Sequence, residues 1–262
     1  MAQLFIFGLG YSAARIAASA RAQGWQVSAT GSAGDMAFAD DARVRPALAA
    51  ASHVLSSVPP SEESGDPVLA AYGTALAGKR VAYLSATGVY GDAGGAWVDE
   101  SSPVGTGRRT ARAAADAQWL ALGAHVLRLP GIYGPGRSVF ERLTDGRAQR
   151  IYAPGQVFSR VHVEDIATGT MLALTVDAPA GAYNLADDLP CSQNAVIEHA
   201  CRLSGLPLPP LQTLEQAALS PMARRFYSEN RRVANGKAKR LLGWQPRYPT
   251  YREGLASLLT GT

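Results

Sequence analysis

Short apolar runs alternate with alanine-rich stretches along the first half of the chain. The apolar runs have the length of buried strands, and glycine or proline follows several of them. The alanine-rich stretches carry apolar residues at helical spacing, and Gly24 stands where a helix C-cap is expected. The pattern predicts strands at 3–8, 25–30, 43–48, 53–58, 80–87 and 125–130, and helices at 11–24, 68–77 and about 108–122.

This alternation predicts the fold class. Strands separated by helices of about ten to fifteen residues pair in parallel through right-handed crossovers. The expected fold is α/β, a doubly wound parallel Rossmann sheet with a small interleaved C-terminal substrate lobe. We predict a sheet domain at 1–132, completed by about 161–188 with a strand at 181–187, and a smaller lobe at 133–160 and 189–262.

A glycine-rich loop follows the first predicted strand. The stretch "GLGYSA" matches G-x-G-x-x-G/A and opens the first predicted helix. Gly8 allows the tight turn, Gly10 lets the backbone approach a pyrophosphate, and Ala13 permits close helix–strand packing. With Tyr11 and Ser12, these residues form the predicted phosphate site, because a helix N-terminus offers free N–H groups and a positive dipole.

The end of the second predicted strand bears on the choice between NAD and NADP. A site for NAD usually carries an acidic residue there, which binds the ribose 2′-OH. This chain has Thr30 and Ser32 instead, and no carboxylate before Asp35. The hydroxyls could hold a 2′-phosphate, although no arginine stands beside them. The sequence favours NADP slightly and leaves NAD open.

Composition sets limits on the function. The formal net charge of the 262 residues is +4, which suits a small anionic ligand. Cys191 and Cys201 form no CxxC pair, and the four histidines lack metal-ligand spacing. No apolar run approaches eighteen residues. We therefore expect a protein of the cytoplasm that binds neither a metal nor a membrane.

Several stretches together resemble one family. They are "FGLGYSAARIA", "SATGVYGD", "WVDESSPV", "LRLPGIYGPGRS", "SRVHVEDIA", "GAYNLADD" and "LLGWQPRYPTYREGL", in the family's order and over nearly the whole chain. The sequence is similar to an atypical extended short-chain dehydrogenase/reductase, of the NAD-dependent epimerase/dehydratase type. The resemblance implies NAD or NADP as cofactor and a sugar-like or nucleotide-linked substrate.

The family's catalytic serine or threonine lies three residues before the valine of "VYG". In this chain that position is Ala86. Ser85 and Thr87 flank it, so a hydroxyl stands near but not at the usual place. Tyr90, the tyrosine of "VYG", is the nearest tyrosine and is expected to contact substrate.

The family's Tyr-x-x-x-Lys motif is missing. If Asp116 aligns with the acidic residue that the family carries on this helix, Arg112 takes the lysine position and Arg108 the tyrosine position. A register shifted by one gives Ala113 and Arg109. Arginine cannot exchange a proton near neutral pH. Arg108 and Arg112 could still clamp a phosphate or carboxylate, or could lie on a solvated helix face.

The resemblance also implies further ligand contacts. Residues after the strand at 53–58 pack against adenine-ribose and pyrophosphate in the family, and the "LPGI" segment walls the nicotinamide. The cofactor contacts implied here are Ser56, Val58, Pro59, Pro130, Gly131 and Ile132.

Basic residues beyond the sheet are candidates for an anionic substrate. This set consists of Arg128, Arg137 and Arg160, with the basic C-terminal cluster Arg224, Arg225, Arg231 and Arg232. His162 and Asp165 could orient a substrate or cap the following helix, and capping is the favoured interpretation.

Two functions stay open at this point. The first is an NAD(P)-dependent oxidoreductase or epimerase with an unorthodox acid/base. The second is a catalytically silent dinucleotide-binding sensor or scaffold. Charge alone would support nucleic-acid binding, and no motif does. The helix at 108–122 corresponds to a frequent dimer interface of the family, so a homodimer is expected.

Overall fold

A parallel sheet forms the centre of the protein, as seen in a computed structural model that describes residues 2–107 and 110–260. Its strands run in the order β10-β6-β4-β3-β1-β2, and all neighbouring strands pair in parallel. They are β1 (Gln3–Phe7), β2 (Gln26–Ala29), β3 (His53–Ser56), β4 (Arg80–Ala86), β6 (His125–Leu129) and β10 (Gly181–Asn184). The predicted Rossmann sheet is confirmed, including the late strand that returns to it.

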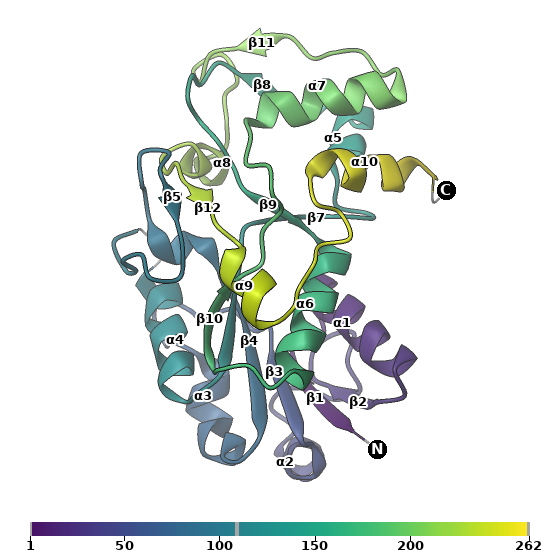
Figure 1. The fold of residues 1–262 in the computed structure, drawn as a ribbon, viewed down its shortest axis with the longest axis vertical. Helices are drawn as coiled ribbons and strands as arrows, with labels where there is room; N and C mark the ends of the chain where they lie inside the picture. Colours follow the sequence, from purple (N-terminus) through teal and green to yellow (C-terminus); the bar gives the residue numbers. More distant parts are fainter. Residues whose placement is uncertain (1, 108–109, 261–262) are drawn as a thin grey trace.

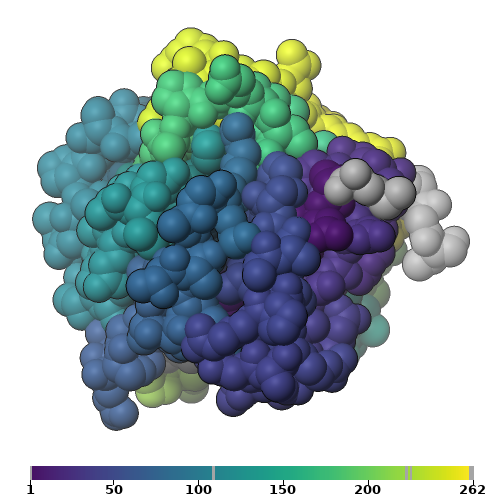
Figure 2. Space-filling model, turned by 90° about the horizontal axis from the view of Figure 1, so that it is seen from below, coloured from purple at the N-terminus to yellow at the C-terminus, as the bar shows by residue number. Residues whose placement is uncertain are grey.

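Helices cover both faces of the sheet (Figure 1). Leu4 and Ile6 point to one face, where α1 (Tyr11–Ala22) and α6 (Val163–Thr175) pack side by side. Phe5 and Phe7 point to the other face, because successive side chains of a strand alternate. That face is covered by α2 (Asp41–Ala50), α3 (Pro67–Tyr72) with the 3-10 turn η1 (Gly73–Leu76), and α4 (Thr110–Ala121). Seen from below, the blue and teal first half of the chain forms most of the surface (Figure 2).

The predicted strand at 43–48 is wrong, because these residues belong to α2. Val44 and Leu48 lie four residues apart and are both buried in the core beside Phe5 and Phe7. Arg45 also pairs with Asp41 across one helical turn, at 2.9 Å. Burial at helical spacing outweighs the presence of Pro46 inside the helix.

The smaller lobe lies above the carboxyl ends of the strands (Figure 1). It contains α5 (Val139–Thr144), α7 (Gln193–Ser204) and α10 (Tyr251–Thr260), and the parallel pair β8 (Arg150–Ile151) and β11 (Leu211–Gln212). Tyr133, Val196 and Leu255 are buried in its core. Two further parallel pairs connect it to the sheet: β7 (Gly131–Tyr133) with β9 (Arg160–His162), and β5 (Trp97–Val98) with β12 (Arg232–Val233). The 3-10 turn η2 (Thr87–Tyr90), α8 (Pro221–Phe226) and α9 (Gly236–Leu241) complete the fold.

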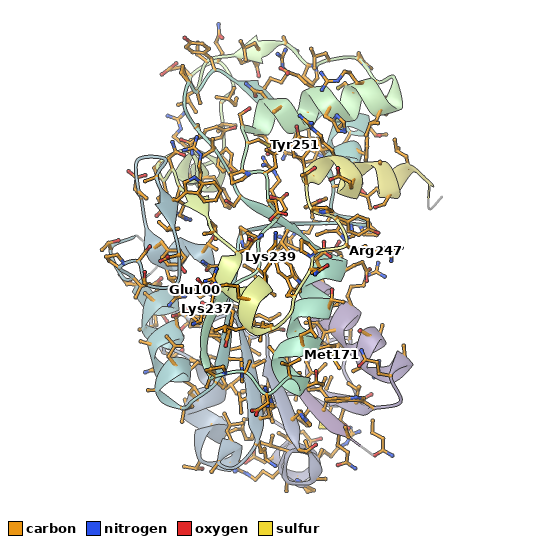
Figure 3. All side chains as sticks on the ribbon, viewed as in Figure 1. Glu100, Met171, Lys237, Lys239, Arg247 and Tyr251 are labelled. Atoms are coloured by element: carbon orange, nitrogen blue, oxygen red, sulfur yellow. The ribbon has the colours of Figure 1, made fainter. Side chains whose placement is uncertain are left out.

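The buried carboxylate of Asp165 fastens the C-terminal segment to α6. It accepts the backbone N–H groups of Arg247 and Tyr248 at 2.5 and 3.2 Å. Trp244 donates its indole N–H to the Asp165 carbonyl at 3.0 Å. Figure 3 shows Arg247 at the end of the segment that follows α9. Within the described residues, no helix is long and apolar enough to cross a membrane.

Candidate dinucleotide and substrate site

A cavity of about 650 Å³ lies between the sheet and the smaller lobe. Its floor includes the start of α1 and the ends of β4 and β6, and its roof comes from the smaller lobe and the segment after α8. In open parallel sheets, ligands bind outside the carboxyl ends of the strands. The predicted site residues that line it are Gly10, Tyr11, Ser12, Ala13, Ser85, Thr87, Arg112, Pro130, Gly131, Ile132, Arg137 and Arg160.

The glycine-rich loop is held by backbone and hydroxyl contacts. Gly8 has a φ of +83°, a conformation that glycine adopts at little cost. Its N–H donates to the Thr30 hydroxyl at 3.1 Å, and the Leu9 N–H donates to the Thr30 carbonyl at 2.8 Å. Ser57 donates its hydroxyl to the Gly8 carbonyl. The loop is therefore fixed before any ligand binds.

Gly10 leaves an open approach to the start of α1. It is the N-cap residue, and no side chain caps this helix end. Apart from its chain neighbours, no described residue comes within 4 Å of a Cβ added to Gly10, so the space in front of it is available to a ligand. The helix N-terminus faces the cavity and can bind an anion through its N–H groups. These residues fit the pyrophosphate of a dinucleotide.

The hydroxyl of Ser85 is committed to a buried ion pair. Ser85 donates to Asp116 Oδ2 at 2.6 Å. Arg128 binds the same carboxylate through two N–H groups, at 2.7 and 3.1 Å. The Ser85 oxygen can therefore accept a hydrogen bond from a ligand in the cavity but cannot donate one.

The buried network continues to Tyr90, which does not line the cavity. Arg128 donates to the Tyr90 hydroxyl at 3.0 Å, and that hydroxyl donates to Asn184 at 2.8 Å. Burial raises the pKa of Tyr90 to about 12. Glu100 accepts the Asn184 N–H at 2.6 Å and lies beside Lys237 (Figure 3). Tyr90 thus connects the ends of β6 and β10 through hydrogen bonds outside the cavity lining.

Thr87 and Arg112 line the cavity near the carboxyl end of β4. The buried Thr87 hydroxyl makes no hydrogen bond within the described residues, so its proton is available to a ligand. Arg112 donates to the Tyr83 hydroxyl at 2.9 Å, which places its guanidinium at the edge of β4. Arg108, the predicted partner at the tyrosine position, lies outside the described residues, as does Arg109.

Arginines gather at the smaller-lobe end of the cavity. Arg160 is 7% exposed and donates to the Phe158 carbonyl and the Gln193 side chain, at 2.8 and 3.0 Å. No ion pair of Arg160 occurs among the described residues, so its buried charge favours an incoming anion. A second cavity of about 370 Å³ shares Arg137, Arg142 and Arg160 with the first.

Other predicted site residues lie outside the cavity lining. His162 caps α6 by accepting the Glu164 N–H at 3.3 Å, which confirms the favoured interpretation for His162, whereas the Asp165 carboxylate binds the N–H groups of Arg247 and Tyr248 instead of capping the helix. Its buried position lowers the pKa of His162 to about 4. Predicted cofactor contacts that do not line the cavity are Gly8, Thr30, Ser32, Ser56, Val58 and Pro59.

Some lining residues were not expected from the sequence. Ser57 lines the cavity, whereas the predicted residues on either side of it, Ser56 and Val58, do not. Phe158, Phe226 and Tyr227 supply aromatic rings at the smaller-lobe end. Phe226 and Tyr227 stand between the arginine pairs 224–225 and 231–232, and this neighbourhood was their only signal in the sequence. Nothing in the pattern indicated that this segment folds back over the strand ends.

Comparison with known proteins identifies the family. No protein-family model matches the chain. A solved structure from Silicibacter pomeroyi, described as a functionally unknown conserved protein, is 41% identical. It covers 100% of this chain and 99% of its own, with a TM-score of 0.90. This chain belongs to the family of that Silicibacter protein.

More distant structures show the fold shared by this family. Human epimerase family protein SDR39U1, solved with NADPH, is 16% identical over 99% of this chain and 100% of its own, with a TM-score of 0.76. The dTDP-glucose 4,6-dehydratase of Bacillus anthracis, solved with NAD, is 15% identical over 99% and 96%, with a TM-score of 0.74. The predicted extended short-chain dehydrogenase/reductase fold is thereby confirmed.

A curated relative matches part of the chain. The 3-diazoavenalumate denitrifying reductase of a Streptomyces species is 31% identical over 161 residues. The match spans 56% of this chain and 52% of that enzyme, about half of its length.

Proposed function

We propose that the protein is an NAD(P)-dependent reductase or related oxidoreductase acting on a small anionic molecule. The observation that carries this proposal is the continuity of one cavity, from the uncapped start of α1 past Thr87 to the buried charge of Arg160. A dinucleotide at one end and an anion at the other would meet beside the β4 end. The reductase name of the curated relative points the same way.

The cofactor is a nicotinamide dinucleotide. When bound, its reduced form supplies a hydride to the substrate. The N–H groups at the start of α1 would hold the pyrophosphate, and Pro130, Gly131 and Ile132 would wall the nicotinamide. We propose NADP, because the exposed Ser32 hydroxyl can bind a 2′-phosphate. Asp35, the nearest carboxylate along the chain, accepts the Ala29 N–H at 2.9 Å.

The residues at the β4 end have separate roles. Thr87 would donate a hydrogen bond from its free hydroxyl to the substrate oxygen or nitrogen that gains electron density, and would keep its proton. Ser85 would accept a hydrogen bond from the ligand, since its own proton is held by Asp116. Arg112 would hold a hydroxyl or phosphate and add positive potential, because a guanidinium keeps its proton.

The smaller-lobe end defines the substrate class. Arg160 and Gln193 would bind a carboxylate or phosphate, with Arg137 and Arg142 adding charge. The rings of Phe158 and Tyr227 meet edge to face at 5.5 Å and offer an apolar wall beside these cations. This combination suits an anion with a flat apolar part, whether an aromatic acid or a nucleotide-linked compound.

A second function rests on the missing Tyr-x-x-x-Lys motif, since the resemblance aligns Arg112, or Ala113 in the shifted register, with the family's lysine. A protein that binds the dinucleotide without turning it over would act as a sensor or scaffold. It would bind NADPH tightly and show no oxidation of it with any substrate. The expected homodimer stays a prediction, checked by light scattering.

Activity with a panel of compounds tests the proposal. Oxidation of NADPH and NADH would be followed by absorbance with oxo acids, aromatic acids bearing a reducible group, and nucleotide sugars. We expect turnover with at least one anionic compound, and Arg160→Gln should raise KM more than tenfold. Arg43→Gln is the matched control, because Arg43 is exposed on α2. Tight NADPH binding without any turnover would favour the sensor.

A further inference from the structure

Reduction of a C=O or C=N group requires a proton as well as a hydride. The family's tyrosine is absent, and the arginines of the cavity cannot supply a proton near neutral pH. Residues 108 and 109 are arginines as well, so they cannot supply it either. Ser85 is committed to Asp116, and Tyr11 donates to the Pro135 carbonyl at 3.0 Å. The proton must come from another group or from water.

Tyr227 is a phenol of the cavity whose proton is free. It follows α8 and lines the cavity at the smaller-lobe end. Its hydroxyl makes no hydrogen bond within the described residues, whereas those of Tyr11, Tyr83 and Tyr90 all do. The side chain is half-buried, so the phenol can meet a ligand without being fully solvated.

The position of Tyr227 brings it toward the expected reaction centre. Its ring packs edge-on against Phe158, with ring centroids 5.5 Å apart. The next residue along the chain, Ser159, accepts the Gly131 N–H at 3.2 Å. Gly131 belongs to the wall proposed for the nicotinamide. Tyr227 therefore lines the cavity on the smaller-lobe side, next to the segment that contacts Gly131. Thr87 lines it on the side of the sheet.

The electrostatic surroundings suit a proton donor. Burial raises the pKa of Tyr227, which keeps the phenol protonated at neutral pH. The charges of Arg142, on α5, and Arg160, on β9, act in the opposite direction and would stabilise the phenolate. Glu229 and Arg231 also line the cavity and form an ion pair at 3.0 Å.

We propose that Tyr227 is the general acid of this site, in place of the family's helix tyrosine. This inference rests on the proposed reductase function. As hydride adds to the carbon of the C=O or C=N group, the π electron pair moves to oxygen or nitrogen. That atom takes the phenolic proton, the O–H bond of Tyr227 breaks, and a phenolate remains between the two arginines. Water then returns the proton.

The first test compares Tyr227→Phe with Tyr152→Phe. Tyr152 is exposed and does not line the cavity, so it controls for loss of a hydroxyl. With a substrate found in the panel, Tyr227→Phe should lower kcat about 10²-fold or more, with little change in the dissociation constant of NADPH. Tyr152→Phe should match the unmodified protein. Retention of kcat within threefold in Tyr227→Phe would overturn the assignment.

A second test separates acid catalysis from a structural role. Replacement of Tyr227 by 3-fluorotyrosine makes the phenol more acidic and provides a ¹⁹F resonance. The basic limb of the kcat–pH profile should move to lower pH, and the resonance should titrate with the same midpoint without any substrate. An unmoved profile, or a resonance whose midpoint differs from that of the profile, would contradict the proposal.

Failure of the proposed function would look different. In that case the unmodified protein would oxidise neither NADPH nor NADH with any compound. If the unmodified protein turns over and Tyr227→Phe does so equally well, only the role of Tyr227 is rejected.

Discussion

Ser85 and Asp116 are joined by a 2.6 Å hydrogen bond that removes the serine proton from the cavity. Asp116 is fully buried and forms an ion pair with Arg128, so the carboxylate that accepts the Ser85 proton is fixed in place. Because of this hydrogen bond, the hydroxyls of Ser85 and Thr87 at the end of β4 differ in the hydrogen bonds that they can offer a ligand. Ser85 can only accept from a ligand, while Thr87 is left to donate.

This division predicts different effects of removing each hydroxyl. Thr87→Val should lower kcat about 10²-fold, the usual loss for one donor to a developing negative charge. Ser85→Ala should lower kcat less than about tenfold, because it removes an acceptor and leaves the Asp116–Arg128 pair intact. Steady-state kinetics on the two variants measures both effects. Equal losses would show that Ser85 also acts as a donor.

The Asp116–Arg128 pair predicts a stability effect. Their side chains are 0% and 3% exposed, so removing one partner leaves an uncompensated buried charge. Asp116→Leu should lower the free energy of unfolding by about 3–5 kcal/mol. The double variant with Arg128→Met should recover much of that loss. Denaturant titration measures both, and a double variant no better than Asp116→Leu would argue against the electrostatic explanation.

The two glycines of the loop predict opposite outcomes. Gly10→Ala adds a methyl group that, its chain neighbours aside, meets no atom of the described residues within 4 Å, so stability should fall by less than about 1 kcal/mol. Dinucleotide affinity should fall at least tenfold, because the methyl group occupies the approach of the pyrophosphate.

Gly8→Ala should mainly destabilise the fold. Its φ is +83°, and an added Cβ would lie 3.0 Å from Val58 Cγ2 and 3.1 Å from Ser57 Oγ. The left-handed conformation alone costs about 1–2 kcal/mol. Thermal unfolding and calorimetric titration of both variants check the contrast. Undiminished affinity in Gly10→Ala would place the pyrophosphate elsewhere.

Asp187 predicts a pH dependence of anion binding. Burial raises the pKa of Asp187 to about 7, and Arg160 is the charge that opposes this rise. Below pH 7 the carboxyl is neutral, and Arg160 attracts an anion at full strength. As pH rises through 7 the carboxylate forms and weakens that attraction. Substrate affinity should therefore fall above pH 7, and Asp187→Asn should abolish the fall.

The same group affects stability. The folded-state pKa of Asp187 lies above its unfolded value. Its stabilising contribution to the free energy of unfolding is therefore present below about pH 4 and is lost as pH rises through 7. His162 acts oppositely in the same range, because its pKa is lowered to about 4. Asp187→Asn should thus raise stability at pH 8 relative to pH 5. Denaturant titrations of both proteins at pH 5 and pH 8 measure this. The assignment would be contradicted if the stability difference between the two pH values were the same in Asp187→Asn as in the unmodified protein.

The sequence predicted the strand, glycine turn and helix around Gly8 and Gly10 because the determinants of this geometry are local, and the phosphate-binding role of the turn stays a prediction. Gly8, Gly10 and Ala13 follow a strand directly and open a helix, so no distant contact is needed. The strand expected at 43–48 failed for the opposite reason. Its helix is stabilised by burial of Val44 and Leu48 against the sheet, which a short window does not show.

The smaller-lobe end of the cavity is built from segments that are distant along the chain. Tyr227 lines the same cavity as Thr87, from 140 residues away along the chain, and nothing local in either segment indicates this. Tyr90 shows the converse. Its place in "VYG" predicted a substrate contact, but Arg128 and Asn184, from two other strands, hold its hydroxyl behind the cavity.

Calorimetric titration of the protein with NADPH, NADP⁺, NADH and NAD⁺ tests the central claim most directly. The account predicts micromolar binding of at least one redox pair, tighter for NADP(H), and a loss of at least tenfold in Gly10→Ala. Absence of binding by all four dinucleotides would contradict it.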